Sequence, residues 1–291
     1  MLKRLFSSVG EGATVEWTIE PRREGLGVRL RELFRYHRVL RFFAVKTVVE
    51  MYQGTLLGKI WLLRPILPIA ISAAVFGGIL GVGSDGVPYF LFFLTGSAAW
   101  MLFEQATIWV TRSLDLNKGL VKKVYFPRLV MPLSSASPAV LYFCIFVVLL
   151  AIAFVYYFVT DGRLYLVIGP QLLAAVFAAA CCVTLAVAVG LWTSVWQTRV
   201  REVRFTVRYV LRFWNYLTPV IYPLSKVPSE YRGWMMLNPM AAYVETFKWG
   251  VLGIGTLDIG SLVTALGVTG VMLVAGAWYF TREEAKAIDN L

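Results

Sequence analysis

Long apolar segments, each close to the thickness of a bilayer's hydrocarbon core, recur along the chain and constrain its fold most. They lie near 60–80, 88–111, 132–159, 166–195, 209–224 and 259–280. A helix of about 20 apolar residues is long enough to cross that core. We therefore expect an all-α integral membrane protein with six transmembrane helices. The fifth helix should be the least regular, because Pro219 and Pro223 interrupt it.

Composition supports this class and argues against several functions. Hydrophobic residues make up 58% of the chain, which exceeds the usage of soluble domains. The net charge of +11 could suggest nucleic acid, but Lys and Arg in a membrane protein first report its orientation, so no nucleic-acid partner is expected. With one histidine, and three cysteines within apolar segments, we expect neither a disulfide framework nor a metal site. A membrane-embedded transferase is a distant alternative, because scattered carboxylates do not form an acid–base site.

The basic residues are divided unequally between the two sides of the expected membrane domain. Of 28 Lys and Arg residues, 24 lie on one side and 4 on the other. Because cytoplasmic loops carry the excess of positive charge, both termini should be cytoplasmic. This predicts a cytoplasmic segment with interface helices over 1–59, a transmembrane domain over 60–280 and a cytoplasmic tail over 281–291.

The N-terminal segment contains an amphipathic stretch from about residue 28 to residue 52. Arg31, Arg35 and Arg38 recur at helical spacing on one face, while apolar residues occupy another. The stretch is too charged to span a bilayer and too apolar to remain in water. We expect an interface helix there, with a soluble helical hairpin as the alternative.

The loop over 112–130 combines five basic residues with apolar and aromatic ones in RSLDLNKGLVKKVYFPR (112–128). Its charge density requires water, so the loop should lie on the cytoplasmic side. A solvated loop does not need the apolar and aromatic residues at its centre. We interpret it as a docking surface for a partner protein, with an ordinary orientation signal as the alternative.

The segment over 225–258 is apolar but contains Arg232, Glu245 and Lys248. A full span there would bury three charges and would place the C-terminus on the wrong side. Two short helices broken at Asn238-Pro239, re-entering the outer leaflet as a hairpin, fit better. Irregular backbone at membrane depth needs protein or a cavity around it, so this hairpin should border a pathway.

Several segments occur in the order found in one known family. They are GTLLGKIWLLRPILP (54–68), YFLFFLTGSAAWMLF (89–103), GLVKKVYFPRLVMPLSS (119–135), VREVRFTVRYVLRFWNYLTPVIYP (200–223) and LNPMAAYVETFKW (237–249). The chain resembles the permease subunits of bacterial ABC exporters that move lipid-linked polysaccharides, such as O antigens, and teichoic acids. Export of a teichoic acid, a capsule or a small-molecule drug is the alternative within this family.

The resemblance implies a homodimer in the bacterial cytoplasmic membrane, bound to two copies of a separate ATPase. The chain has no GxxxxGK[ST] phosphate loop, so ATP and Mg²⁺ would bind the ATPase. An undecaprenyl-type lipid-linked glycan would be the substrate, with membrane lipids around it. The loop would couple to the ATPase through Leu120, Lys122, Lys123, Val124, Tyr125, Phe126 and Arg128. The lipid headgroup would be attracted by Lys46, Lys59 and Arg64, for which snorkelling to anionic lipids is the alternative.

Aromatic stripes suggest where a glycan could pass, because aromatic faces stack on sugar rings. One stripe follows the second expected span, with Tyr89, Phe93, Trp100 and Phe103, and a shorter one follows the fifth, with Tyr209, Phe213 and Tyr216. Tyr89 and Tyr209 could instead belong to an interfacial belt. Glu104 is an intramembrane carboxylate and thus a functional candidate. The candidate gate residues are Tyr222, Asn238, Pro239 and Glu245.

Overall fold

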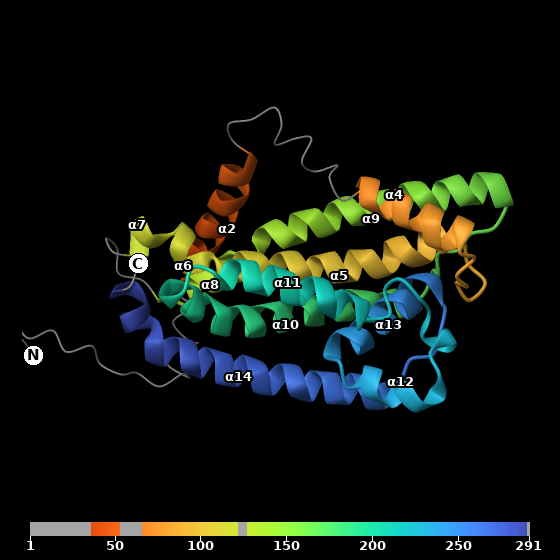
Figure 1. Ribbon diagram of the computed structural model, residues 1–291. Coiled ribbons are helices and arrows are strands. Elements are labelled where there is room, and N and C mark those ends of the chain that lie inside the picture. The colour runs from red at the N-terminus through yellow and green to blue at the C-terminus, as the bar shows by residue number, and fades with distance from the viewer. Residues whose placement is uncertain (1–35, 53–65, 122–126, 290–291) are drawn as a thin grey trace, which may run out of the picture.

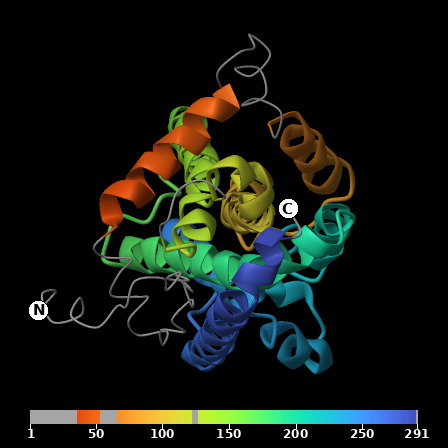
Figure 2. The same cartoon turned by 90° about the vertical axis from the view of Figure 1, so that its left-hand side faces the viewer.

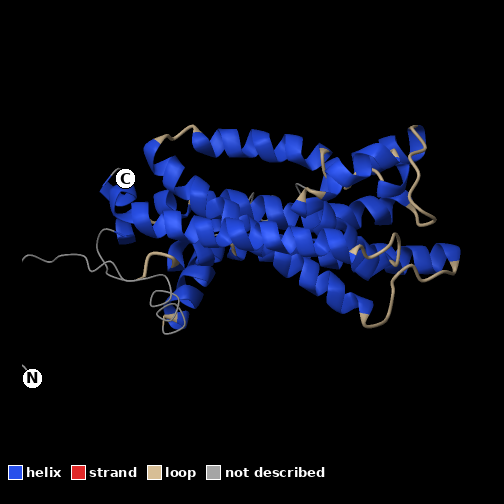
Figure 3. Ribbon diagram, turned by 90° about the horizontal axis from the view of Figure 1, so that it is seen from below, coloured by secondary structure: helices blue, strands red, loops and turns tan. Residues whose placement is uncertain are grey.

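The computed structural model describes residues 36–52, 66–121 and 127–289, and it is helical throughout these ranges apart from turns and loops (Figure 3). The first part comprises α2 (His37–Tyr52), α4 (Ile66–Ala73) with a π-helical extension (Ala74–Ile79), α5 (Tyr89–Thr111), α6 (Ser113–Leu116), α7 (Lys118–Val121) and α8 (Val130–Ser134). The second part comprises α9 (Ser137–Asp161), α10 (Gln171–Arg199), α11 (Val203–Tyr216), a 3₁₀ turn (Leu224–Lys226), α12 (Ser229–Met236), α13 (Pro239–Leu252) and α14 (Ile259–Asp289). The all-α prediction is confirmed.

Within the described residues, three helical stretches are long and apolar enough to cross a membrane. They cover Val130–Asp161, Gln171–Arg199 and Ile259–Glu284, and Ile66–Ile79 forms a shorter apolar helix. The long helices α5, α9, α10 and α14 run along a common direction (Figure 1). The chain is therefore a multi-pass membrane protein.

The helix α5 lies at the centre of the bundle, where α9, α10, α11 and α13 contact it (Figure 2). Of its 23 residues, 16 are buried. Because other helices cover most of its surface, α5 does not need the uniformly apolar exterior of a lipid-facing helix. This explains how a helix containing Glu104 and Gln105 can occupy the core of a membrane protein.

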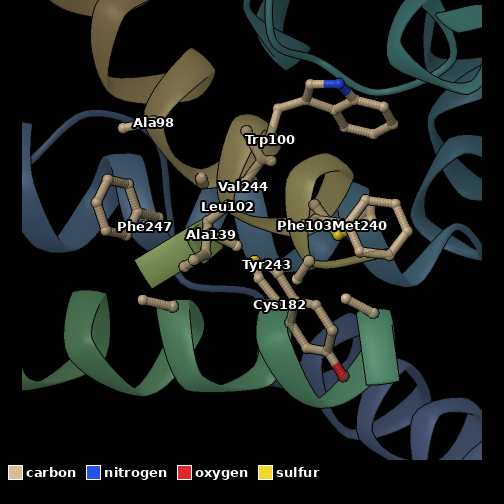
Figure 4. Packing of buried hydrophobic residues seen from close by; sticks show 14 of the residues in the cluster. Ala98, Trp100, Leu102, Phe103, Ala139, Cys182, Met240, Tyr243, Val244 and Phe247 are labelled. Atoms are coloured by element: carbon tan, nitrogen blue, oxygen red, sulfur yellow. The ribbon is translucent and has the colours of Figure 1, made fainter. Parts of the chain in front are cut away.

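Close helix contacts depend on glycine, as at Gly190 and Gly250. A Cβ on Gly190 of α10 would overlap the side chain of Val110 of α5. A Cβ on Gly250 of α13 would lie 2.7 Å from the backbone nitrogen of Ala175 of α10. Small residues permit such close approach of helices in membranes, where packing and not water expulsion holds them together. Figure 4 shows buried side chains of the core, among them Trp100, Phe103 and Tyr243.

The helix α2 crosses the bundle steeply and does not follow its axis (Figure 1). It packs on α8 and α9, where buried Phe43 contacts Val130 and Met131. The hydroxyl of Ser137 at the start of α9 also donates a hydrogen bond to the carbonyl oxygen of Ala44, at 2.9 Å. The helix α2 is therefore anchored at one end of the bundle, and its place in the membrane interface stays a prediction.

The largest difference from the sequence prediction concerns the fifth span. The expected range was 209–224, whereas α11 covers Val203–Tyr216 and is followed by turns. Proline provides no backbone donor and disfavours helix in the residue before it, so Pro219 and Pro223 end the helix early. The expected break at Asn238-Pro239 does fall between two helices, α12 and α13.

Candidate functional site: a cationic cavity beside the central helix

A cavity of about 540 Å³ lies between α4, α5 and α11, beside the centre of the bundle. Its wall is polar as well as apolar, which is unusual for a site among apolar helices. The polar side chains that line it are Ser72, Ser97, Glu104, Gln105, Arg112, Tyr142, Arg208, Arg212 and Asn215. Aromatic and aliphatic lining is provided by Ile69, Phe93, Trp100, Met101, Ile108 and Trp109, with Pro68 at the rim.

Helical spacing explains how two sequence segments line one cavity. Along α5, the lining side chains recur every three or four residues from Phe93 to Arg112, which is one face of a helix. In α11, Leu211 is buried against the bundle, and Arg208 and Arg212 lie one turn apart on the adjacent face. The two charged helix faces therefore meet at the cavity.

Glu104 is half-buried and provides the carboxylate of the cavity wall. The indole Nε1 of Trp100 donates a hydrogen bond of 2.8 Å to its Oε2. Arg212 and Arg208 act electrostatically on this carboxylate. Among the described residues, however, neither arginine lies within the 4.0 Å of an ion pair with it. The arginines therefore keep their hydrogen-bond donors available to another anion.

Arg112 lies where α5 ends, at the end of the same cavity. Its Nε is buried and has no hydrogen-bond partner within the described part of the chain. Burial lowers the pKa of the Arg112 guanidinium, and the nearby positive charge of Arg208 lowers it further. A guanidinium nevertheless stays protonated in proteins, so Arg112 contributes a full positive charge.

The first aromatic stripe divides between the cavity and the helix core. Trp100 and Phe93 line the cavity, while Phe103 is fully buried and packs edge-to-face on Trp214 of α11, with ring centroids 5.3 Å apart. The ring of Tyr89 stacks on Phe93, and its hydroxyl donates to the carbonyl oxygen of Ile221, at 2.6 Å. Trp100 is as fully buried as Phe103 and packs edge-to-face on it, with ring centroids 5.5 Å apart. Both rings therefore hold helices together, and Trp100 also borders the cavity.

The second aromatic stripe faces outward from α11. Tyr209, Phe213 and Tyr216 are exposed by 63%, 68% and 59%, respectively, and do not line the cavity. They lie beside the arginine face of the same helix. Since a single chain leaves this stripe uncovered, lipid or another macromolecule must cover it in the membrane.

The predicted gate residues lie around the break between α12 and α13. The Asn238 side chain accepts hydrogen bonds from the Met240 amide at 3.0 Å and from the Trp214 indole at 2.9 Å, and it donates to Thr218 at 3.0 Å. Pro239 begins α13, where its missing N–H costs nothing. The Tyr222 hydroxyl donates to the carbonyl oxygen of Tyr216. Asn238 thus connects the end of α11 to the start of α13.

Lys248 is a buried cation that sequence reasoning did not place in the site. Its side chain is fully buried on α13, and its ammonium donates to the carbonyl oxygen of Pro219. The ammonium also lies 3.4 Å from Glu245 Oε1 and 3.8 Å from the ring centroid of Phe92 on α5. Gly96 makes room, because a Cβ there would lie 2.9 Å from Lys248 Cε. Lys248 therefore fixes the turn after α11 against α13 and α5.

Comparison with known proteins identifies the family. Residues 38–252 match the ABC-2 type transporter family, which is most of the chain. The chain belongs to the ABC-2 type transporter family. It is a transport permease and not an enzyme, as expected.

Relatives of this ABC-2 permease include proteins named for polysaccharide transport. The chain is 26% identical to the O-antigen export system permease protein RfbA of Myxococcus xanthus, over 90% of this chain and 98% of the relative. It is 25% identical to the polysialic acid transport protein KpsM of Escherichia coli, over 79% and 87%, respectively. The inner membrane transport permease YadH of Escherichia coli is 33% identical over 86 residues, which is 30% of this chain and 32% of YadH.

Part of the predicted coupling and headgroup sites of the ABC-2 permease lies outside the described residues, namely Lys59, Arg64, Lys122, Lys123, Val124, Tyr125 and Phe126. Leu120 lies on α7, and half-buried Arg128 precedes α8. Lys46 lies on α2, with its ammonium 5.9 Å from the ring centroid of Phe43. The described residues include no group of three or more His, Cys, Asp or Glu side chains placed to hold a metal ion.

Sequence reasoning missed the arginines of α11 as site residues. There they count only among the 24 basic residues that indicate orientation. Their spacing at Arg204, Arg208 and Arg212 was a usable signal, because residues four apart share one face of a helix. Assigning the helix to 209–224 concealed that face.

Proposed function

We propose that this ABC-2 permease exports a lipid-linked polysaccharide, such as an O antigen, across the cytoplasmic membrane. ATP hydrolysis on a separate ATPase, which binds ATP and Mg²⁺, drives the transport. The carrying observation is a cavity within the helical bundle that combines arginines with aromatic side chains, beside the exposed aromatic stripe of α11. The similarity to RfbA, which spans nearly the whole of both chains, supports this substrate class.

The permease crosses the membrane six times in this proposal, with α4 and its extension, α5, α9, α10, α11 and α14 as the spans. Both termini and the loop over 112–130 are then cytoplasmic, which agrees with the distribution of basic residues. The loop docks the ATPase through its apolar and aromatic centre. The helix α2 lies in the cytoplasmic interface, where its steep crossing angle suits that position (Figure 1).

A homodimer bound to two ATPase copies is the proposed assembly. The outward stripe of Tyr209, Phe213 and Tyr216 supports it, because a second copy facing α11 would enclose an aromatic path. Aromatic side chains stack on successive sugar rings without requiring one sequence of sugars. Such a path suits a long polymer that must slide and not remain bound.

The hairpin of α12 and α13 re-enters the outer leaflet in this proposal and gates the exit. Asn238 and Tyr222 both bond to the segment that follows or ends α11, so a movement of the hairpin changes the end of the path. Glu245 pairs with Lys248 within α13, so this ion pair moves together with the hairpin.

An anionic capsule polysaccharide is the second candidate substrate. The arginines of the cavity favour it, since they suit a negatively charged chain, and KpsM is named for polysialic acid transport.

Deleting the gene in its native bacterium distinguishes the substrates, because the surface glycan that disappears is the one that the permease exports. We expect long-chain glycan to disappear from the cell surface while the lipid-linked form accumulates inside. Unchanged surface glycans would contradict the proposed function.

A further inference from the structure

The segment that follows α11 is held firmly where it begins. Fully buried Lys248 of α13 donates a hydrogen bond to the carbonyl oxygen of Pro219. The Tyr89 hydroxyl of α5 donates to the carbonyl oxygen of Ile221 at 2.6 Å. Val220, between these two acceptors, is only 1% exposed. Two core helices therefore fix the chain here, because breaking these bonds would leave buried polar groups without partners.

The chain beyond this point is held much less firmly. The flap, which we define as residues 224–236, comprises the 3₁₀ turn and α12, and none of its residues is buried. Arg232 holds the flap together internally, since its guanidinium donates to the carbonyl oxygens of Ser225 and Val227, each at 2.7 Å. By contrast, 12 of the 14 residues of α13 are buried. The flap can therefore move as a unit more readily than α13 can.

A turn from a distant part of the chain holds the flap in place. This turn, over 81–87, joins the π-helical extension of α4 to α5, and it lies at the same end of the bundle as α12 (Figure 1). The Ser225 hydroxyl of the flap donates to Asp85 Oδ1 of the turn at 2.7 Å. The next side chain, Lys226, passes close to Gly83, where an added Cβ would lie 2.9 Å from Lys226 Cε. The flap and the turn thus contact each other although they are 140 residues apart.

The backbone of Asp85 indicates that this contact is imposed by the surrounding structure. With a φ of 51°, Asp85 is the one non-glycine residue of the described ranges in the left-handed region. Aspartate adopts this conformation more readily than most residues, but the conformation is still unfavourable for an L-residue. Residues held in such conformations cluster at switch regions and ligand clamps, where the unfavourable backbone is part of the mechanism.

We propose that the hydrogen bond between Ser225 and Asp85 is a latch that holds the flap shut over the outer end of the bundle and opens during transport. Both residues are exposed, so water can replace this bond at little cost, whereas the buried bond at Pro219 persists. The flap has room to move, because a cavity of about 570 Å³ separates it from α13 and the start of α14. This inference rests on the proposed function, and it narrows the moving part of the exit gate to the flap.

A reversible crosslink across the latch tests whether it opens. Asp85 and Ser225 are both replaced by Cys in a permease in which exposed Cys144 is already Ser. A short, reducible bifunctional methanethiosulfonate then joins the two positions in cells that express the permease and its ATPase. Appearance of new surface glycan should fall to background and should recover when a reductant cleaves the crosslink.

The matched control is a second Asp–Ser pair at the same end of the bundle. The Ser261 hydroxyl donates to the Asp258 carboxylate at the start of α14, and both residues line the cavity beside the flap. A crosslink between Cys replacements at these two positions stays within the start of one helix. Export should therefore be equal before and after crosslinking, and a loss as large as that at Asp85 and Ser225 would overturn the inference.

Removing the latch without a crosslink should open the flap more often. Ala242 of α13 lines the cavity beside the flap and is 2% exposed, so a cysteine placed there reports opening through labelling by a membrane-impermeant maleimide. Asp85→Ala should accelerate this labelling by about 5-fold, the bias that one exposed hydrogen bond provides. Asp85→Asn keeps an acceptor for Ser225 and should label at nearly the original rate.

Buried Cys181 and Cys182 of α10 provide the internal control for folding. Their labelling should not change, and if Asp85 only stabilised the fold, it would rise together with labelling at position 242. Undiminished export by the crosslinked latch variant would overturn the inference, and so would unchanged labelling at position 242 in Asp85→Ala.

Failure of the latch is distinguishable from failure of the proposed function, because maleimide labelling requires no glycan. Surface glycan lost on gene deletion, with export that is indifferent to the crosslink, refutes the latch alone. Surface glycan retained on gene deletion, with labelling that depends on Asp85, refutes the glycan-export function alone.

Discussion

Replacing Lys248 with Met should destabilise the permease strongly, although the two side chains have similar length. The fully buried ammonium bonds the carbonyl oxygen of Pro219, faces Glu245 at 3.4 Å and lies over the ring of Phe92. Methionine would leave that carbonyl without its donor. It would also leave Glu245 without its counter-charge.

The magnitude can be worked from these contacts. An unsatisfied buried carbonyl costs about 1–3 kcal/mol, and a desolvated cation–π contact is worth about 2 kcal/mol. Glu245 keeps partial exposure, so losing its partner adds about 1 kcal/mol or less. Removing the buried charge recovers part of its desolvation cost. A net loss of about 3 kcal/mol in the free energy of unfolding is expected.

A thiol-reactive fluorophore can follow this loss during thermal unfolding. Cys181 and Cys182 are buried in α10, so they react as the bundle opens, while exposed Cys144 can first be replaced by Ser. The midpoint should fall by about 5 °C or more. Glu245→Gln is the matched control, which should shift it by less than half as much. An unchanged midpoint in Lys248→Met would refute the assigned role of Lys248.

Three further predictions concern the stripe, the hairpin and the loop. Phe103→Ala should lower the free energy of unfolding by about 3–5 kcal/mol, and the melting temperature with it. Trp100→Phe should keep the fold and reduce glycan export per folded molecule. If both variants lowered the melting temperature equally, both rings would serve packing only. Asn238→Ala should lower the free energy of unfolding by about 2 kcal/mol, because it removes the helix cap of α13 and the hydrogen bond from the Trp214 indole. A melting temperature equal to that of the wild type would exclude the role of Asn238 between α11 and α13. Replacing Tyr125 and Phe126 with Ala should lower co-purification of the ATPase, and unchanged assembly would mean that the loop only orients the chain.

Much of the fold was predictable because its causes are local in the chain. Apolar length marks a span wherever the helix faces lipid, as in the helices α9, α10 and α14. Proline lacks a backbone donor and disfavours helix in the residue before it, so the irregular fifth segment and the break at Asn238-Pro239 could be expected. Orientation of the spans relative to the two sides of the membrane stays a prediction.

The cavity could not be predicted, because it depends on which helices meet. The arginines at 208 and 212 share a face in the sequence, but nothing local shows that this face meets α5 and not water. Similarly, Trp100 and Phe103 belong to one stripe, yet the structure places one at the cavity and the other between helices. A stripe defines a side of a helix, and tertiary packing decides what covers each residue on it.

Photocrosslinking of the substrate to α11 tests the central claim of a glycan path most directly. A photoreactive phenylalanine analogue at Phe213, in the outward aromatic stripe, should capture lipid-linked glycan in cells during export. The control position is Val155 on α9, which is exposed to a similar degree, at 63% against 68%. The account predicts glycan crosslinked at Phe213 and none at Val155. Equal crosslinking at both positions, or crosslinking at Val155 alone, would contradict it.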